Sequence, residues 1–325
     1  MREILIGVAA SMFFAVTFIL NRSMELAGGS WMWSASLRFL FMVPFLLLIV
    51  LVRKNGKQVF LELKEHPLIW IGWSFVGFVL FYAPLTYAAA YGPGWLIAGT
   101  WQITIAAGIL LTPFFYTTVY VGSRPEKRRE RVPIRSLLIS FLILAGVCLI
   151  QLPHLEKVTL LELTAGVFPV LVAAFCYPLG NRKMMAFSSD RLDTFQRILG
   201  MTLASLPFWL ILSTTALVTA GPPAQGQVLQ SFIVAVCSGV MATTLFFIAT
   251  DRSRHQSGKL AAVEATQSTQ VLFVLLGEVL LLSAPLPGLT AFFGIGILVT
   301  GIILHSLTVK KGKAPVRRDV TLKRA

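Results

Sequence analysis

Long apolar runs separated by short polar segments dominate this chain. Residues 4–21, 136–155 and 163–181 carry no Asp, Glu, Lys or Arg, and each run is long enough to cross a bilayer once as a helix. The longer runs at 66–123 and 198–250 are each interrupted once by turn-forming residues. The pattern predicts an all-α membrane protein with ten transmembrane helices, near residues 4–22, 31–52, 68–90, 94–116, 134–152, 160–181, 193–218, 228–250, 259–283 and 288–309.

The two halves of the chain carry similar short sequences in the same order. Asn21–Met24 (NRSM) is matched by Asn181–Met184 (NRKM), 160 residues later. A duplicated unit with an odd number of spans inserts its second copy upside down, as in many secondary transporters. We therefore expect two inverted five-helix repeats, 1–154 and 155–309, followed by a basic tail, 310–325. Further matches follow at nearly the same offset: Arg38 with Arg197, residues 100–104 with 265–269, and residues 142–147 with 297–302.

Composition and charge place the chain in a membrane. Hydrophobic residues make up 56% of the 325 positions, charged residues only 13%, and the net charge is +14. With the amino terminus inside, nearly all Lys and Arg fall on the cytoplasmic side, and the outer side receives only Arg22 and Lys157. The positive-inside rule therefore predicts that both termini are cytoplasmic. We expect the basic tail to contact anionic lipid rather than nucleic acid.

Several segments of the sequence resemble a known group of transporters. The second half has Leu276-Gly277-Glu278 before a turn, and then Gly294 and Gly301-Ile302 in the last helix. The first half has Met1-Arg2-Glu3-Ile4, then Asn21-Arg22-Ser23-Met24-Glu25-Leu26 and Gly29-Ser30-Trp31. Together they are similar to the drug/metabolite transporter superfamily and, within it, to bacterial multidrug resistance efflux transporters.

The resemblance implies a proton-coupled exporter of lipophilic or cationic drugs in the bacterial inner membrane. It implies alternating access and a substrate pathway between the two halves. The expected partners are the small-molecule substrate, protons and membrane lipid. A monomer or a homodimer is expected. A monomer would suffice, because one chain already holds both halves. The alternatives are an exporter of amino acids or other metabolites, a non-transporting membrane scaffold, and a lipid-modifying enzyme without a recognisable motif.

The sequence lacks the common catalytic and cofactor motifs, so it gives no support to an enzyme. The sequence has no Gly-x-x-x-x-Gly-Lys-Ser/Thr phosphate loop and no His-Glu-x-x-His zinc motif. The four His residues are scattered near the ends of spans, so we expect no metal site and no cofactor.

Glu264 is the leading candidate for a proton or substrate site. It lies about two turns into the ninth predicted helix, with no adjacent Lys or Arg. A charged carboxylate at the centre of a membrane helix costs about 2.5–3.5 kcal/mol on insertion scales, so its presence calls for a reason. One hypothesis is that a proton and a cationic substrate compete for it. The alternative is a structural pair with a base such as Lys259 or Arg197.

Other polar residues are expected to line or close the pathway. Arg38 and Arg197 occupy equivalent positions in the repeats; they either support the scaffold or attract an anionic group of the substrate. Asn21 and Asn181 are candidates for gates at opposite mouths, with helix capping as the alternative. Glu278 is expected to have a structural role near a helix end. The candidate lining residues are Gln267, Tyr82, Thr86, Trp101, Gln102 and Thr243.

Overall fold

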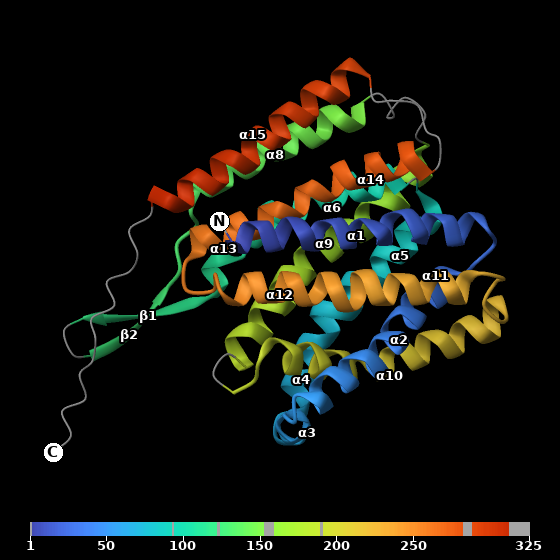
Figure 1. Ribbon diagram of the computed structural model, residues 1–325, viewed down its shortest axis with the longest axis horizontal. Helices are drawn as coiled ribbons and strands as arrows, with labels where there is room; N and C mark the ends of the chain where they lie inside the picture. Colours follow the sequence, from blue (N-terminus) through green and yellow to red (C-terminus); the bar gives the residue numbers. More distant parts are fainter. Residues whose placement is uncertain are drawn as a thin grey trace.

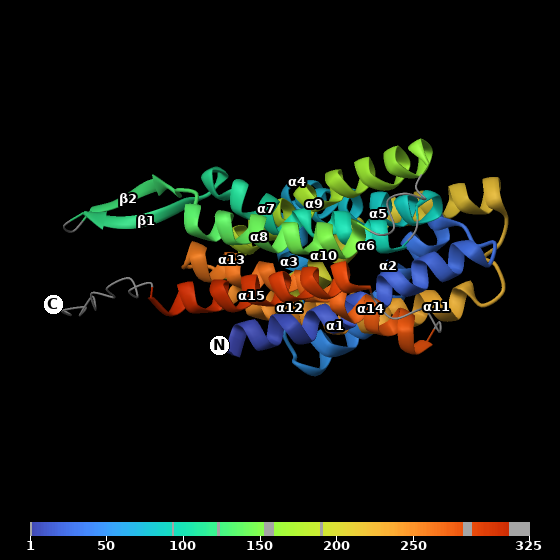
Figure 2. The same ribbon diagram turned by 90° about the horizontal axis from the view of Figure 1, so that it is seen from above.

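The computed structural model describes residues 2–92, 94–121, 124–152, 159–188, 191–281 and 288–311. Most helices run along one axis of an elongated bundle (Figures 1 and 2). Within the described residues, eight helices are long and apolar enough to cross a membrane, and two further apolar helices, Leu96–Leu110 and Leu289–His305, are shorter. The eight are Arg2–Leu26, Trp31–Val52, Pro67–Tyr91, Ile134–Gln151, Leu163–Ser188, Thr194–Ala220, Gln227–Asp251 and Ser257–Gly277.

The individual elements follow the predicted spans closely. In chain order they are α1 (Arg2–Leu26), α2 (Trp31–Val52), α3 (Gly56–Glu65), α4 (Pro67–Ser74), η1 (Phe75–Val79), α5 (Leu80–Tyr91), α6 (Gly94–Trp101), α7 (Ile103–Leu110), η2 (Thr112–Phe114), β1 (Tyr116–Val121), β2 (Arg124–Arg129), α8 (Ile134–Gln151), α9 (Leu160–Ser188), α10 (Thr194–Ala220), α11 (Gln227–Val234), η4 (Ala235–Ala242), α12 (Thr243–Asp251), α13 (Ser257–Ala265), η5 (Thr266–Ser268), α14 (Thr269–Leu281) and α15 (Leu289–Lys311).

Four spans depart from regular α-helix near their middles. The segments η1 and η4 are π-helical, so each inserts extra backbone between two α-helical parts of one span. A turn at Gln102 separates α6 from α7, and the 3₁₀ segment η5 separates α13 from α14. Such irregular turns often mark functional positions in membrane helices, because they redirect side chains and free backbone groups.

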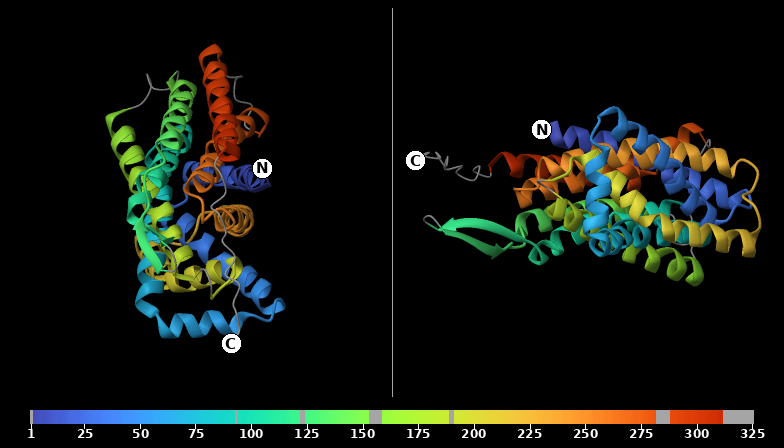
Figure 3. Two further views of the ribbon diagram at one scale, coloured as in Figure 1. Left: turned by 90° about the vertical axis from the view of Figure 1, so that its left-hand side faces the viewer. Right: turned by 90° about the horizontal axis from the view of Figure 1, so that it is seen from below.

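Small residues allow the helices to approach closely. The backbones of Gly77 in η1 and Gly180 in α9 are in direct contact, and a Cβ on Gly146 of α8 would lie 2.8 Å from the Gly294 carbonyl oxygen of α15. Helices α8 and α15 lie side by side along one edge of the bundle (Figures 1 and 3). The other close pairs are α5 with α9, α2 with α10, and α1 with η4, α12 and α14.

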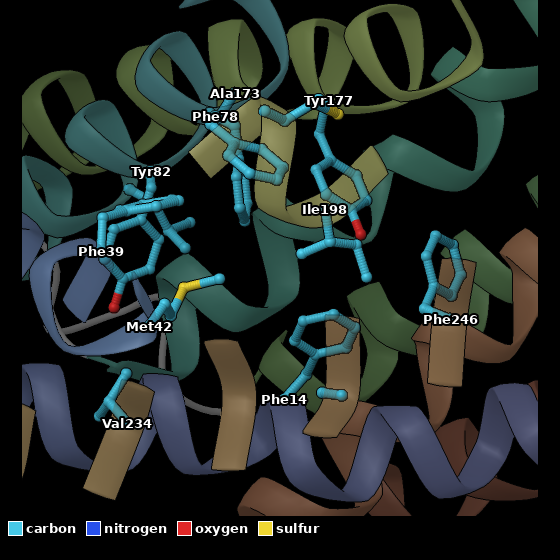
Figure 4. Packing of buried hydrophobic residues seen from close by; sticks show 14 of the residues in the cluster. Phe14, Phe39, Met42, Phe78, Tyr82, Ala173, Tyr177, Ile198, Val234 and Phe246 are labelled. Carbon is cyan, nitrogen blue, oxygen red and sulfur yellow. The ribbon is translucent and has the colours of Figure 1, made fainter. Parts of the chain in front are cut away.

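Aromatic side chains fill the centre of the bundle. Phe39 stacks on Trp209 with ring centroids 4.4 Å apart, and Phe81 lies 4.5 Å from Tyr177. Figure 4 shows how Phe39, Tyr177 and their neighbours from several helices meet in this core. The outer surface carries many exposed large apolar side chains, as expected for a protein that faces lipid.

Two elements differ from the predicted all-α pattern. The predicted helix 94–116 ends at Leu110, because Pro113 lacks a backbone N–H and disfavours helical geometry in the residue before it. The predicted basic loop that follows forms an antiparallel hairpin of β1 and β2, in which Tyr116 pairs with Arg129. The β-branched and aromatic residues of β1 favour a strand.

Helix α3 was not predicted and lies across the long axis of the bundle (Figure 3). Val59 and Glu62 face the protein, whereas Phe60 and Leu61 are exposed. This amphipathic pattern suits a helix that lies in the plane of a membrane surface.

Candidate substrate pathway and ionic gate

A narrow cavity lies at the centre of the bundle and receives side chains from both halves of the chain. Its volume is about 10 Å³, room for about one water molecule. A molecule larger than water fits only if the helices around the cavity move apart. The lining residues are Phe14, Thr17, Phe18, Arg38, Phe81, Leu85, Trp101, Tyr177, Ser238, Gln267 and Gln270.

Unpaired polar atoms are concentrated around this cavity. Each of the five side chains that bear them is no more than 4% exposed, and none of these atoms has a hydrogen-bond partner. A buried polar group without a partner costs about 1–3 kcal/mol, so protein interiors normally pair them. Their concentration at one cavity is typical of a ligand site. The atoms are Thr17 Oγ1, Arg38 Nε, Tyr177 Oη, Gln267 Nε2 and Gln270 Oε1.

Arg38 is the charged group of the cavity. Its guanidinium carbon lies 3.9 Å from the centroid of the Tyr82 ring, and Nη2 donates to Ser238 Oγ at 3.2 Å. Among the described side chains, no carboxylate lies within ion-pair distance of this guanidinium. The aromatic face stabilises the cation but leaves its charge without a counter-ion.

A second small cavity continues from the first toward the end of the bundle away from the start of α1. The two cavities share Phe18 and Leu85, and the second is also lined by Asn21. Asn21 Nδ2 donates to the Tyr82 hydroxyl at 3.3 Å. Arg22 donates to the carbonyl oxygen of Ala89 at 3.0 Å, so it caps the last turn of α5 at this end.

Toward the opposite end of the bundle, a buried ion pair joins α9 to α13. Arg182 Nε donates to Glu264 Oε1 at 2.8 Å, and Nη2 donates to Glu264 Oε2 at 2.5 Å. Both side chains are 6% exposed. A planar guanidinium bound to a carboxylate by two hydrogen bonds is the strongest pairing that these groups form. Gly108 makes room for it, because a Cβ at this position would collide with Glu264 Oε2.

Further ion pairs lie at the same end of the bundle as the Arg182–Glu264 pair. Arg197 Nη1 binds Asp251 Oδ1 at 2.5 Å and lies over the ring of Phe247, 4.8 Å from its centroid. Thr194 also donates to Asp251, at 2.5 Å. The remaining pairs join Arg53 with Asp193, Arg191 with Glu62, and Lys259 with Glu3.

Glu130 follows β2 at this end, outside the spans. Burial raises the pKa of its carboxyl above the ordinary glutamate range, and the positive charge of Arg182 partly offsets that rise. A proton on Glu130 therefore becomes easier to retain than on an exposed glutamate.

The structure brings several of the predicted site residues together. Arg38, Trp101 and Gln267 line the central cavity, and Tyr82 contacts Arg38. Asn21 lines the second cavity. The residues that line the central cavity come from both the first and the second half of the chain.

Other predicted lining residues bond mainly to their own helices. Thr86 donates to the Tyr82 carbonyl, Gln102 to that of Ala98, and Thr243 to that of Ser238. Asn181 is buried with its Oδ1 unpaired. The side chain of Glu278 lies outside the described part of the structure.

The expected partners of Glu264 were wrong. Lys259 binds Glu3, Arg197 binds Asp251, and the base that binds Glu264 is Arg182. The charge pattern counts Arg182 among the basic residues of the cytoplasmic side, and the structure shows that its side chain is buried. The missed lining residues include Tyr177, Ser238 and Gln270, for which the only sequence signal is a polar group inside an apolar span.

These features define a multi-pass membrane protein with a polar, aromatic interior. The family described as "EmrE: Putative multidrug resistance efflux transporter" matches residues 1–311. The chain belongs to this family of membrane transporters.

Two bacterial proteins are similar to this chain in sequence. The chain is 58% identical over 313 residues to "Uncharacterized protein YjlA" of Bacillus subtilis (strain 168), which covers 96% of this chain and 97% of the relative. It is 50% identical over 268 residues to "Uncharacterized 42.1 kDa protein in intracellular alkaline protease 3'region" of Shouchella clausii, covering 82% of this chain and 70% of that protein.

A solved structure described as "Crystal structure of protein" superposes with a TM-score of 0.70 at 16% identity. The superposition covers 95% of this chain and 99% of the other. At this identity the likeness concerns the fold alone.

Proposed function

We propose that the protein is a secondary active exporter of small molecules that works by alternating access between two inverted five-helix halves. The observation that carries the proposal is the buried cavity with unpaired polar atoms, together with the buried Arg182–Glu264 pair toward one end of the bundle. A cavity between helices, with an ionic gate that must break before a solute passes, suits a transporter better than a scaffold.

The packing supports two corresponding halves, and the proposed boundary at 154/155 lies outside the described residues. Helix α5 packs on α9 much as α12 and η4 pack on α1, and α6 and α7 pack on α9 much as α13 and α14 pack on α1. The π segments η1 and η4 fall in corresponding spans. The breaks at Gln102 and at Gln267 also correspond, since the matching sequence segments differ by 165 positions.

The orientation is argued from charge. The start of α1 and the end of α15 lie at the same end of the bundle as the basic hairpin (Figures 1 and 2). The positive-inside rule puts this end in the cytoplasm of a bacterial inner membrane. The gate of Arg182 and Glu264 is then the cytoplasmic gate, and Arg22 lies at the outer end. One chain contains both halves, so a monomer is sufficient.

Glu264 is the proposed coupling residue, and Arg182 competes with the proton for its carboxylate. When the carboxylate is ionised, it binds Arg182 and the cytoplasmic end stays closed. A proton that enters from outside neutralises Glu264 and weakens the pair, so the cytoplasmic end opens. Substrate binds from the cytoplasm while the pair is broken, and the proton then leaves to the cytoplasm. The ionised Glu264 binds Arg182 again, which closes this end before substrate is released outside.

The test uses purified protein in liposomes with an imposed pH gradient. A panel of lipophilic cations, amino acids and organic carboxylates is added in turn to wild type and to Glu264→Gln. Dissipation of the gradient that depends on a substrate, and that is lost in the variant, supports proton-coupled export. A gradient that no compound dissipates, together with no flux of any labelled solute, contradicts the proposed function.

A further inference from the structure

The buried arginines of this protein differ in how their charge is balanced. Arg182 binds Glu264, and Arg197 binds Asp251. Arg38 is as deeply buried as Arg197, yet among the described residues it has no carboxylate partner. Placing an arginine in a membrane interior costs free energy unless something balances its charge, so the exception calls for a reason.

The second half has an aspartate beside its buried arginine, and the first half has a threonine at the corresponding position. Arg197 lies over Phe247, and one turn later on the same helix Asp251 binds it. Arg38 lies over Tyr82, and one turn later the chain has Thr86. The Thr86 hydroxyl donates to backbone carbonyls of its own helix, so it offers the guanidinium no negative charge.

Of the five unpaired polar atoms around this cavity, four belong to groups that can donate a hydrogen bond, and the fifth, Gln270 Oε1, is an acceptor. Gln267 Oε1 already accepts from Gln270 Nε2, which leaves Gln267 Nε2 free to donate. The hydroxyls of Tyr177 and Thr17 and the Nε of Arg38 are also unpaired. Beside these donors stand aromatic side chains, namely Phe14, Phe81 and Trp101. A carboxylate accepts hydrogen bonds only, and an apolar group suits the aromatic wall.

We propose that the central cavity is an anion site, and that the substrate is an organic carboxylate with one negative charge and an aromatic or branched apolar body. The transport role of the site rests on the exporter proposed above. A lipophilic cation fits poorly, because it meets the positive Arg38 while Glu264 is occupied by Arg182. The substrate supplies the counter-ion that the first half lacks.

The experiment measures ligand binding by the purified full-length protein through tryptophan fluorescence and thermal unfolding. The probes are 3-phenylpropionate, 3-phenylpropanamide and 3-phenylpropylamine, which have similar size and carry negative, zero and positive charge. We expect the carboxylate to bind best and to raise the unfolding temperature. Arg38→Gln is expected to weaken that binding by about 10-fold or more, because a hydrogen bond to a charged group is worth about 1.5–3 kcal/mol.

Two kinds of variant make this result interpretable. Arg252→Gln removes an exposed positive charge outside the cavity and should leave carboxylate binding unchanged. Ser238→Ala and Gln267→Leu keep Arg38 in place, and each is expected to weaken carboxylate binding several-fold, so the test stands even if Arg38→Gln does not fold.

The inference is overturned if the amine or the amide binds as well as the carboxylate, if Arg38→Gln binds the carboxylate like wild type, or if none of the three probes binds. Flux of a cation in liposomes without carboxylate binding would overturn the anion site and leave the exporter intact. Carboxylate binding lost in Arg38→Gln, but without flux of any solute, would support the anion site and contradict the exporter.

Discussion

Arg182 and Glu264, 82 positions apart in the chain, are joined by two hydrogen bonds of 2.8 and 2.5 Å inside the bundle. The pair links α9 to α13 and so ties the first helix of the second half to the ninth span. Because both side chains are buried, each depends on the other for its charge to be tolerated. This mutual dependence is why we propose the pair as a switch, since loss of one charge removes the reason for contact.

Neutralising Glu264 is expected to destabilise the protein. Glu264→Gln leaves Arg182 buried without a counter-ion, and breaking a buried pair by removing one partner costs roughly 3–5 kcal/mol. The thermal unfolding of the single variants and of Arg182→Met/Glu264→Met in detergent measures this. The double variant should be less destabilised than the sum of the two singles, whereas additive losses would show that the two side chains act independently.

Gly108 is expected to resist substitution because of its neighbour. In Gly108→Ala the new Cβ would collide with Glu264 Oε2 and force the carboxylate away from Arg182. We predict a lower unfolding temperature and loss of substrate-dependent proton flux. Gly296→Ala is the matched control, because a Cβ there meets no heavy atom within 4 Å and alanine favours a helix. Equal effects of the two substitutions would contradict the steric argument.

Arg38 and Arg197 should respond differently to removal of their charge. Arg197→Gln leaves Asp251 with a hydrogen bond from Thr194 but without its ion-pair partner, so a substantial loss of stability is expected. Arg38→Gln removes a charge that no described carboxylate balances, so the protein should lose little stability or gain some. Unfolding temperatures without ligand test this order, and the reverse order would show that Arg38 has a structural counter-ion.

The hairpin end should show a pH dependence that originates at Glu130. Its raised pKa means that folding favours the protonated carboxyl, so this contribution to stability is present at low pH and is lost as the pH rises through the folded-state pKa. Glu130→Gln keeps the neutral form at every pH. Its unfolding temperature relative to wild type should therefore increase from pH 5 to pH 8, and a constant difference would contradict the burial argument.

The orientation has an independent test in cysteine labelling. With Cys148, Cys176 and Cys237 replaced, Gln225→Cys should react with an impermeant reagent from outside intact cells, and Gln256→Cys only after the cells are opened. Both positions are exposed, so accessibility depends on the side of the membrane rather than on burial. The opposite result would reverse the direction that we assign to the gate.

Eight of the ten predicted spans correspond to described helices long enough to cross a membrane, because their apolar runs are long and are separated by turn residues. The sequence named Trp101 and Gln267 as lining residues and Arg38 as a scaffold or anion-attracting residue. All three line the central cavity, as expected for a polar group inside an apolar helix. The partner of Glu264 could not be predicted from spacing. Arg182 stands directly after Asn181 near the end of its predicted helix, where a basic residue normally faces the membrane surface.

Other differences arise from tertiary context. The hairpin of β1 and β2 forms in a segment whose strong charge favoured a loop, and the pairing of Tyr116 with Arg129 depends on backbone bonds that carry no periodic signal. The π segments η1 and η4 could not be predicted either, because a π-helix has no distinctive residue pattern. The five unpaired polar atoms could not be predicted from the sequence, because they depend on how side chains from both halves pack around one cavity.

The most direct test of alternating access determines from which side of the membrane a reagent reaches the central cavity. Thr17 lines the cavity with an unpaired hydroxyl, so Thr17→Cys, in a chain free of other cysteines, changes little and reports access to an impermeant thiol reagent. In oriented vesicles we predict faster reaction from outside, and a shift toward the cytoplasmic side when Glu264→Gln is added. Equal reaction from both sides, or a pattern that Glu264→Gln leaves unchanged, would contradict the Arg182–Glu264 gate.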